Sequence, residues 1–195
     1  MSGTADVARK RVAVLISGRG SNMAALIEAA KAPDYPAEIV LVVANKADAG
    51  GLAIARGAGI PAIAATAKDK PAMEAEINRA LDAADIDIVA LAGFMRILSA
   101  GFVQRWAGRL INIHPSLLPA FPGLDTHGRA LAAGMSRHGC TVHYVTAGVD
   151  EGPVIAQAEV PVLPGDTPET LAARVLIEEH KLYPKALAMV AGGSS

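Results

Sequence analysis

The sequence has few of the residues that mark disulfide-bonded, zinc-binding or nucleic-acid-binding proteins. Cys140 is the only cysteine among 195 residues. The chain can therefore form no internal disulfide, and it has no cysteine pair for a zinc site. A reducing, cytoplasmic compartment fits this composition best. Eighteen Lys and Arg against nineteen Asp and Glu leave a formal net charge of −1, which argues against a dedicated binder of nucleic acid.

Long apolar runs are also missing. The first ten residues lack the apolar core of a secretory signal, and the runs at 39–44 and 88–95 are far shorter than a membrane span. We therefore expect no membrane association. Apolar residues are nevertheless plentiful, at 52% of the chain, and the length suits one domain. We expect a single domain over residues 1–195, with an ordered core over about 11–190.

The order of strands and helices predicts the fold class. Short β-branched runs alternate with helical segments in the first half, at residues 11–17, 38–44, 60–64 and 87–91. Strands separated by helices indicate βαβ units, hence an α/β fold with a doubly wound, mainly parallel sheet. Further extended runs at 109–113, 139–145 and 154–160 have no long helix between the last two, which predicts an antiparallel extension in the C-terminal half.

Several residues predict where helices begin and end. Ser21 or Asn22 can cap the first helix, and Asp48 can cap the second. Thr167 followed by a proline predicts the start of the last helix, and Pro184 should bend or stop it.

The turn at residues 18–22, Gly-Arg-Gly-Ser-Asn, can bind an anion. It does not match a dinucleotide fingerprint, because Met23 stands where the third glycine belongs and Asn45, not an acidic residue, ends the second strand. Two glycines and a helix N-terminus can still hold a phosphate monoester. An ordinary capped turn explains the same residues, and the spacing leaves both interpretations open.

Asn112 and His114 are the main catalytic candidates. Residues i and i+2 of a strand project from the same face, and these two stand near its carboxyl end, where open α/β sheets bind ligands. An amide donor beside an imidazole can stabilise an oxyanion and move a proton. Asp150 lies in a turn sequence and gains a role only if the fold brings it to His114.

The remaining polar residues carry weaker hypotheses. Four histidines at 114, 127, 138 and 143 invite a metal site, but no pair has the spacing of a zinc protease. Residues 178–180, which include Glu179, are typical of a solvated helix face unless a ligand reaches them. Ser116 lacks the Gly-x-Ser-x-Gly frame of a nucleophile.

Taken together, the segments resemble the folate-dependent phosphoribosylglycinamide formyltransferases. The resemblance covers residues 11–188 in the expected order and rests on these motifs: GRGSN (18–22), NKADAGGL (45–52), LAGFMRILS (91–99), NIHPSLLPAFPG (112–123), THGRAL (126–131), DEGPVIAQ (150–157) and RVLIEEHKLYP (174–184). SLLP is shared across folate formyltransferases, whereas the glycine loop combined with EEHKLYP is more selective.

The resemblance implies transfer of a formyl group from 10-formyltetrahydrofolate to the amine of glycinamide ribonucleotide in purine synthesis. It implies that Asn112 and protonated His114 stabilise the oxyanion while Asp150 holds His114 charged. Gly20, Ser21 and Asn22 would bind the substrate phosphate, and Glu179 the ribose and amine end. The folate would contact a larger set: Lys70, Met95, Arg96, Ile97, Leu98, Asn112, Thr146, Ala147, Gly148, Val149 and Asp150.

Two positions depart from the family pattern. Arg19 stands where the family often has Asn, which is tolerable if the backbone binds the phosphate. Lys70 stands where an Arg often contacts the folate tail, and Lys cannot form a bidentate fork with a carboxylate.

The expected partners are therefore small molecules, with no metal, nucleic acid or membrane, in a monomer or homodimer. Three alternatives stay open. A formyltetrahydrofolate hydrolase usually carries an extra N-terminal domain, and a methionyl-tRNA formyltransferase needs a tRNA-binding domain and a more basic surface. A phosphosugar-binding module without catalysis would not need His114.

Overall fold

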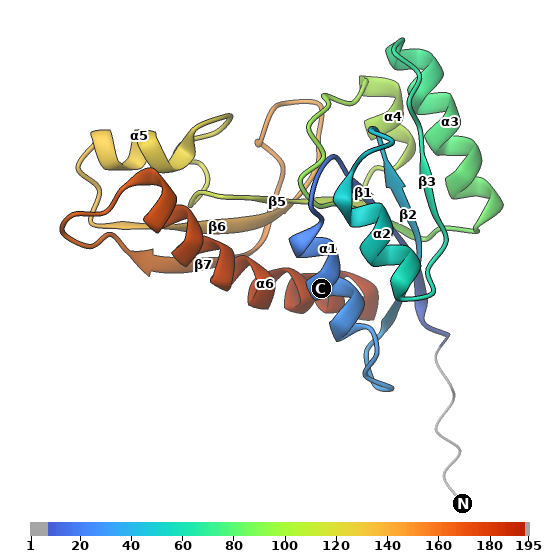
Figure 1. Ribbon diagram of the computed structural model, residues 1–195, viewed down its shortest axis with the longest axis horizontal. Helices are drawn as coiled ribbons and strands as arrows, with labels where there is room; N and C mark the ends of the chain where they lie inside the picture. The colour runs from blue at the N-terminus through green and yellow to red at the C-terminus, as the bar shows by residue number, and fades with distance from the viewer. Residues whose placement is uncertain (1–7, 194–195) are drawn as a thin grey trace, which may run out of the picture.

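A seven-stranded sheet with helices on both faces forms the framework of the computed structural model, which describes residues 8–193 (Figure 1). The strand order is β3-β2-β1-β4-β5-β6-β7. The strands are β1 (Lys10–Ile16), β2 (Ala37–Ala44), β3 (Ala62–Ala64), β4 (Ile88–Leu91), β5 (Leu110–His114), β6 (Arg137–Tyr144) and β7 (Val154–Pro161). The first five run parallel, whereas β6 and β7 are antiparallel. The predicted fold class, with its antiparallel C-terminal extension, is confirmed.

The helices divide between the two faces of the sheet. The core on one face includes residues of α1 (Ser21–Ala29), α2 (Gly50–Gly57) and α6 (Pro168–Gly192), and the core on the other includes α3 (Lys70–Ala83) and α4 (Ala100–Arg105). The short α5 (Thr126–Ala132) packs against α6. Within residues 8–193 we find no helix of the length and apolar character that a membrane span needs.

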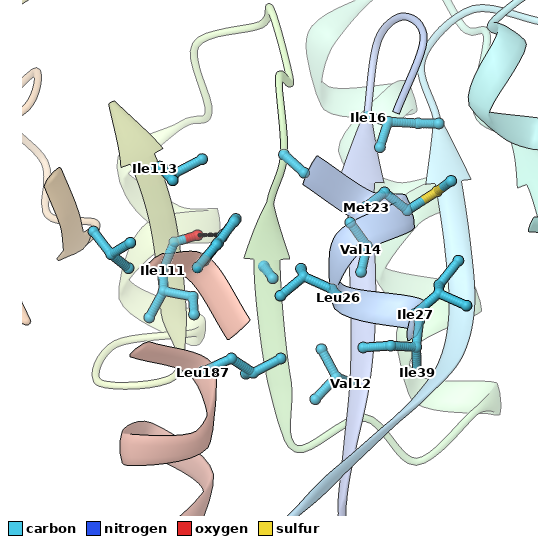
Figure 2. Close-up of a cluster of buried hydrophobic side chains, with 14 of the residues drawn as sticks. Val12, Val14, Ile16, Met23, Leu26, Ile27, Ile39, Ile111, Ile113 and Leu187 are labelled. Atoms are coloured by element: carbon cyan, nitrogen blue, oxygen red, sulfur yellow. Dashed lines mark hydrogen bonds between the residues drawn. The ribbon is translucent and has the colours of Figure 1, made fainter. Parts of the chain in front are cut away.

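Alternate side chains of a strand point to opposite faces of the sheet, so one set enters the core and the other faces the candidate site. Val12, Val14 and Ile16 of β1 lie against Met23 and Leu26 of α1, as Figure 2 shows. Ile111 and Ile113 of β5 belong to the same buried cluster as Leu187 of α6 (Figure 2). Since successive side chains of a strand point to opposite faces, Asn112 and His114 project from the other side of β5.

Some predicted helix boundaries are wrong. Gly20, in the left-handed region at φ 72°, is the N-cap of α1, and no side chain caps that end. Ser21 and Asn22 are instead the first residues of the helix. The N-cap of α2 is Ala49 rather than Asp48. The sequence patterns do not predict the six-residue α4, although Ser99 caps it by accepting a hydrogen bond from Phe102 N at 3.2 Å.

Pro184 does not stop the last helix, which continues through it to Gly192. A proline inside a helix costs about 3 kcal/mol or more because one backbone hydrogen bond is lost. Burial of the neighbouring Tyr183 and Leu187, both 0% exposed, offsets this cost. The Pro184 carbonyl also accepts a hydrogen bond from Tyr35 Oη at 2.7 Å.

Candidate active site

The polar side chains of β5 stand opposite polar side chains of β6. In the antiparallel register Asn112 faces His143 and His114 faces Thr141. Side chains of directly opposed residues share one face of a sheet. The connection between β6 and β7, which carries Asp150, brings a carboxylate to this face.

Both ring nitrogens of His114 face acceptors. Nδ1 lies 3.4 Å from Oδ2 of Asp150, and Nε2 lies 2.9 Å from the carbonyl oxygen of Phe121. A carbonyl can only accept, so Nε2 carries a hydrogen. His114 is 6% exposed. The ring is therefore held between two acceptors, with a carboxylate at Nδ1.

Asp150 is held by the backbone around it. Its φ is 54°, in the left-handed region that Asp and Asn tolerate best, and Oδ2 accepts a hydrogen bond from Gly123 N at 2.9 Å. A hollow of about 420 Å³ adjoins this carboxylate and is lined by Leu118, Pro119, Pro122, Val149, Asp150, Glu151, Gly152 and Val154. The fold therefore brings Asp150 to His114. From the sequence alone, a role for Asp150 depended on this contact.

His143 is the residue that sequence reasoning missed, apart from its place among the clustered histidines. Nδ1 donates to the Tyr144 carbonyl at 3.0 Å, which leaves Nε2 to accept from the Asn112 amide at 3.3 Å. Burial lowers the pKa of His143 and favours this neutral form. Asn112 is thus fixed through one amide hydrogen while the other stays free. The strand register that creates the pair is not readable from either segment alone.

The glycine loop brings two helix N-termini together. A Cβ on Gly20 would lie 3.1 Å from the Cα of Gly51, which belongs to the first turn of α2. Gly51 N in turn donates to the Gly18 carbonyl at 3.0 Å. Backbone N–H groups at helix starts are unpaired within the helix and attract anions. The close packing explains why glycines stand at positions 20 and 51.

Glu179 and Asn22 meet across α6 and α1. Glu179 is 7% exposed, so the expectation of a solvated face is wrong at this residue, because α1 packs over it. Burial raises the pKa of Glu179 to about 7, although a hydrogen bond with the Asn22 side chain acts in the opposite direction. The buried Oδ1 of Asn22 has no hydrogen-bond partner among the described residues. Two of the four predicted ribonucleotide-binding residues are thus brought into contact.

The predicted folate-binding segments leave apolar side chains uncovered. Met95 is 65% exposed, Ile97 72% and Val149 57%. Leu98 and Val145 pack against one buried cluster, so residues 95–98 and the start of the 146–150 loop lie on the same side of the sheet. Lys70 begins α3.

Hydrogen bonds fix both ends of the 95–98 segment. Met95 N donates to Ser17 Oγ at 2.8 Å, and Ser99 N donates to Glu74 Oε1 at 2.6 Å. Glu74 stands one helical turn after Lys70 on α3, so the two side chains share one side of that helix.

The clustered histidines form two separate pairs of hydrogen-bonding distance. His138 Nε2 lies 3.1 Å from His127 Nδ1, and His143 Nε2 lies 3.3 Å from the Asn112 amide nitrogen. Among residues 8–193 no set of three or more His, Cys, Asp or Glu is arranged to hold a metal ion.

Comparison with known proteins gives similar chains of two kinds. Phosphoribosylglycinamide formyltransferase of Escherichia coli is 49% identical over 185 residues, covering 93% of this chain and 87% of that protein. The trifunctional purine biosynthetic protein adenosine-3 of Drosophila pseudoobscura is 56% identical over 191 residues, and its human counterpart is 49% identical over 189. This chain spans 14% of the length of the fly protein and 19% of the human one.

Solved structures show the same likeness. Phosphoribosylglycinamide formyltransferase from Brucella melitensis superposes with a TM-score of 0.91 at 58% identity, covering 96% of this chain and 98% of that one. Glycinamide ribonucleotide transformylase 1 from Symbiobacterium toebii gives a TM-score of 0.91 at 46% identity, covering 95% and 89%. The family model described as formyl transferase matches residues 10–187. With nearly the whole described chain inside that match, the protein belongs to the formyl transferase family.

Proposed function

We propose that the protein transfers the formyl group of 10-formyltetrahydrofolate to the amine of glycinamide ribonucleotide, as a step of purine synthesis. The observation that carries this proposal is His114, held between Asp150 and the Phe121 carbonyl and standing beside Asn112 on one sheet face. The names of the similar proteins supply the substrate class, and the geometry supplies a chemistry that fits it.

The reaction needs a donor for developing negative charge. The substrate amine attacks the formyl carbon, and the carbonyl oxygen becomes an oxyanion. The free amide hydrogen of Asn112 donates to that oxygen. The positive charge of the His114 imidazolium, whose two N–H groups face Asp150 and the Phe121 carbonyl, stabilises the oxyanion electrostatically, and Asp150 balances the imidazolium charge. Collapse of the intermediate breaks the bond to N10 of the folate. The proton lost by the attacking amine passes to N10 as it leaves, with Asp150 and His114 assisting the transfer.

The ribonucleotide binds between the glycine loop and α6. Backbone N–H groups after Gly20, together with Ser21 and Asn22, hold the phosphate, which needs no excess of Lys or Arg. Glu179 receives the ribose and amine end. Its pKa of about 7 allows it to ionise when ligand donors replace the lost solvent.

The folate lies along the exposed apolar side chains of residues 95–98 and the loop 146–150. Lys70 contacts its acidic tail as a point charge. No metal ion or nucleotide cofactor enters this mechanism. We further propose that residues 1–195 act as one domain, as a monomer or homodimer in the cytoplasm.

One assay tests the reaction. Purified protein is mixed with 10-formyltetrahydrofolate, with and without glycinamide ribonucleotide, and release of tetrahydrofolate is followed. Release that requires the amine supports a transferase, and release without it indicates a hydrolase. No release under either condition contradicts both. His114→Ala should abolish turnover with ribonucleotide binding preserved, whereas a binding module without catalysis would have no turnover to lose.

A further inference from the structure

Three side chains form a row across the last three strands of the sheet. His114 on β5 is opposite Thr141 on β6, and Thr141 is opposite Gln157 on β7. Directly opposed residues project from the same face. The row therefore leads from the proposed catalytic histidine to the edge of the sheet, and two of its members have no part in the chemistry described above.

Thr141 and Gln157 bind the backbone that follows His114. Thr141 Oγ1 donates to the Ser116 carbonyl at 2.7 Å and accepts from Leu118 N at 3.1 Å. The Gln157 amide nitrogen donates to Thr141 Oγ1 at 2.9 Å and to the Leu118 carbonyl at 2.8 Å. A hydroxyl has one hydrogen and two lone pairs, so the capacity of Thr141 is fully used. Thr141 itself is 0% exposed.

The segment held in this way carries the acceptor for His114. Ser116 Oγ lies 2.6 Å from the Ala120 carbonyl and 3.1 Å from the Phe121 carbonyl. The Phe121 carbonyl is the group that faces His114 Nε2 at 2.9 Å. A continuous set of hydrogen bonds therefore runs from Gln157 through Thr141 and Ser116 to the imidazole.

We propose that Thr141 and Gln157 are positioning residues that keep the Phe121 carbonyl against His114, and with it the ring in its reactive orientation. This inference rests on the proposed function. Without the Thr141 hydroxyl, the buried Leu118 N–H and Ser116 carbonyl each lose a partner, which favours movement of the segment. Neither residue lies in the proposed phosphate or folate subsites. Their replacement should therefore slow the chemical step and leave substrate binding unchanged.

The test compares variants that differ by single groups. Thr141→Val removes the hydroxyl and keeps the shape, whereas Thr141→Ser keeps the hydroxyl. Gln157→Leu removes both amide donors at an exposed position. Gln104→Leu, on the exposed surface of α4, is the matched control.

We expect kcat to fall about tenfold or more in Thr141→Val, since small displacements of a catalytic group have large effects. Water can replace part of an exposed amide, so we expect a fall of about threefold in Gln157→Leu. The KM for each substrate should stay within about twofold. Thr141→Ser should restore kcat, and Gln104→Leu should leave it unchanged. Wild-type kcat in both Thr141→Val and Gln157→Leu, or a change confined to KM, overturns the proposal.

An NMR measurement separates this inference from the proposed function. The Nε2–H signal of His114, observed by ¹⁵N–¹H correlation, should exchange slowly with solvent in the wild type and in Thr141→Ser. It should exchange quickly or vanish in Thr141→Val and Gln157→Leu. An unchanged signal in these two variants contradicts the positioning role. If the wild-type protein has no transferase activity, the proposed function is contradicted. The Nε2–H signal of His114 still tests whether Thr141 and Gln157 position the ring.

Discussion

Asp150 Oδ2 stands 3.4 Å from His114 Nδ1 because the connection between β6 and β7 folds back over the face of β5. The same carboxylate lies 3.7 Å from His143 Nε2, on the ring that orients Asn112. The Asp150 carboxylate therefore lies beside both histidines of the proposed site. Its removal should affect catalysis far more than folding.

Asp150→Asn should lower kcat about 100-fold or more, since the group that balances the imidazolium is lost. Asn tolerates the left-handed backbone at this position, so the fold should survive. Asp85→Asn is the matched control, because Asp85 has a φ of 49° and is exposed at the end of α3. Steady-state kinetics and thermal unfolding check both variants. Wild-type kcat in Asp150→Asn would contradict the assigned role.

Glu179→Gln should change how stability depends on pH. Burial raises the pKa of this carboxyl from 4.5 to about 7, so the folded state binds the proton more tightly than the unfolded state. The resulting stability is present below about pH 4.5 and is lost as the pH rises through 7. Urea unfolding without substrates should therefore show that the free energy of unfolding of Glu179→Gln rises relative to that of the wild type between pH 5 and 8, by on the order of 3 kcal/mol.

Glu178→Gln serves as the control for that titration. Glu178 pairs with Lys181 at the surface, at 2.9 Å. Its replacement should leave the pH dependence of unfolding parallel to that of the wild type. If the pH dependence of unfolding of Glu179→Gln also parallels that of the wild type, burial does not raise the pKa of this carboxyl.

Gly20→Ala should weaken binding of the ribonucleotide. A Cβ there would lie 3.0 Å from Met23 Cε and 3.1 Å from Gly51 Cα, at a φ of 72°. The left-handed backbone alone costs about 1–2 kcal/mol for alanine. Gly59→Ala shares this cost at a φ of 76°, but it has no neighbour within 4 Å. We expect both to lower the unfolding temperature and only Gly20→Ala to raise the KM for the ribonucleotide. An equal KM in the two variants would place the phosphate elsewhere.

Lys70→Arg should strengthen binding of the folate. A guanidinium can form two parallel hydrogen bonds to a carboxylate, and an ammonium cannot. The KM for 10-formyltetrahydrofolate should fall by about two- to fivefold, with kcat unchanged. Lys68→Arg, two residues earlier and exposed, should have no such effect. An unchanged KM in Lys70→Arg would remove Lys70 from the folate site.

The sequence predicts the fold and the pair Asn112 and His114 because both depend on local periodicity. Alternating strands and helices specify a parallel sheet, and the i, i+2 spacing specifies a shared face. Contacts between residues far apart in the sequence cannot be predicted from local periodicity. The contact with Asp150 depends on the path of a loop, and the contact between Asn112 and His143 depends on register, which neither segment specifies alone.

The errors have the same origin. The sequence predicts that Pro184 bends or stops α6 and that Glu179 lies on a solvated face, but the helix does not stop at Pro184 and Glu179 is buried. Tertiary packing overrides both signals, since Tyr183 and Leu187 hold the helix on the sheet and α1 covers the carboxyl. A local propensity of a few kcal/mol is smaller than the burial of several large side chains.

Transfer of a labelled formyl group tests the central claim most directly. 10-Formyltetrahydrofolate carrying ¹³C in its formyl group is incubated with glycinamide ribonucleotide and the purified protein, and the products are followed by ¹³C NMR. We predict that the label appears as an amide on the ribonucleotide with the wild type and does not appear with His114→Ala. Label recovered only as free formate, or equal transfer by the two proteins, would contradict the account.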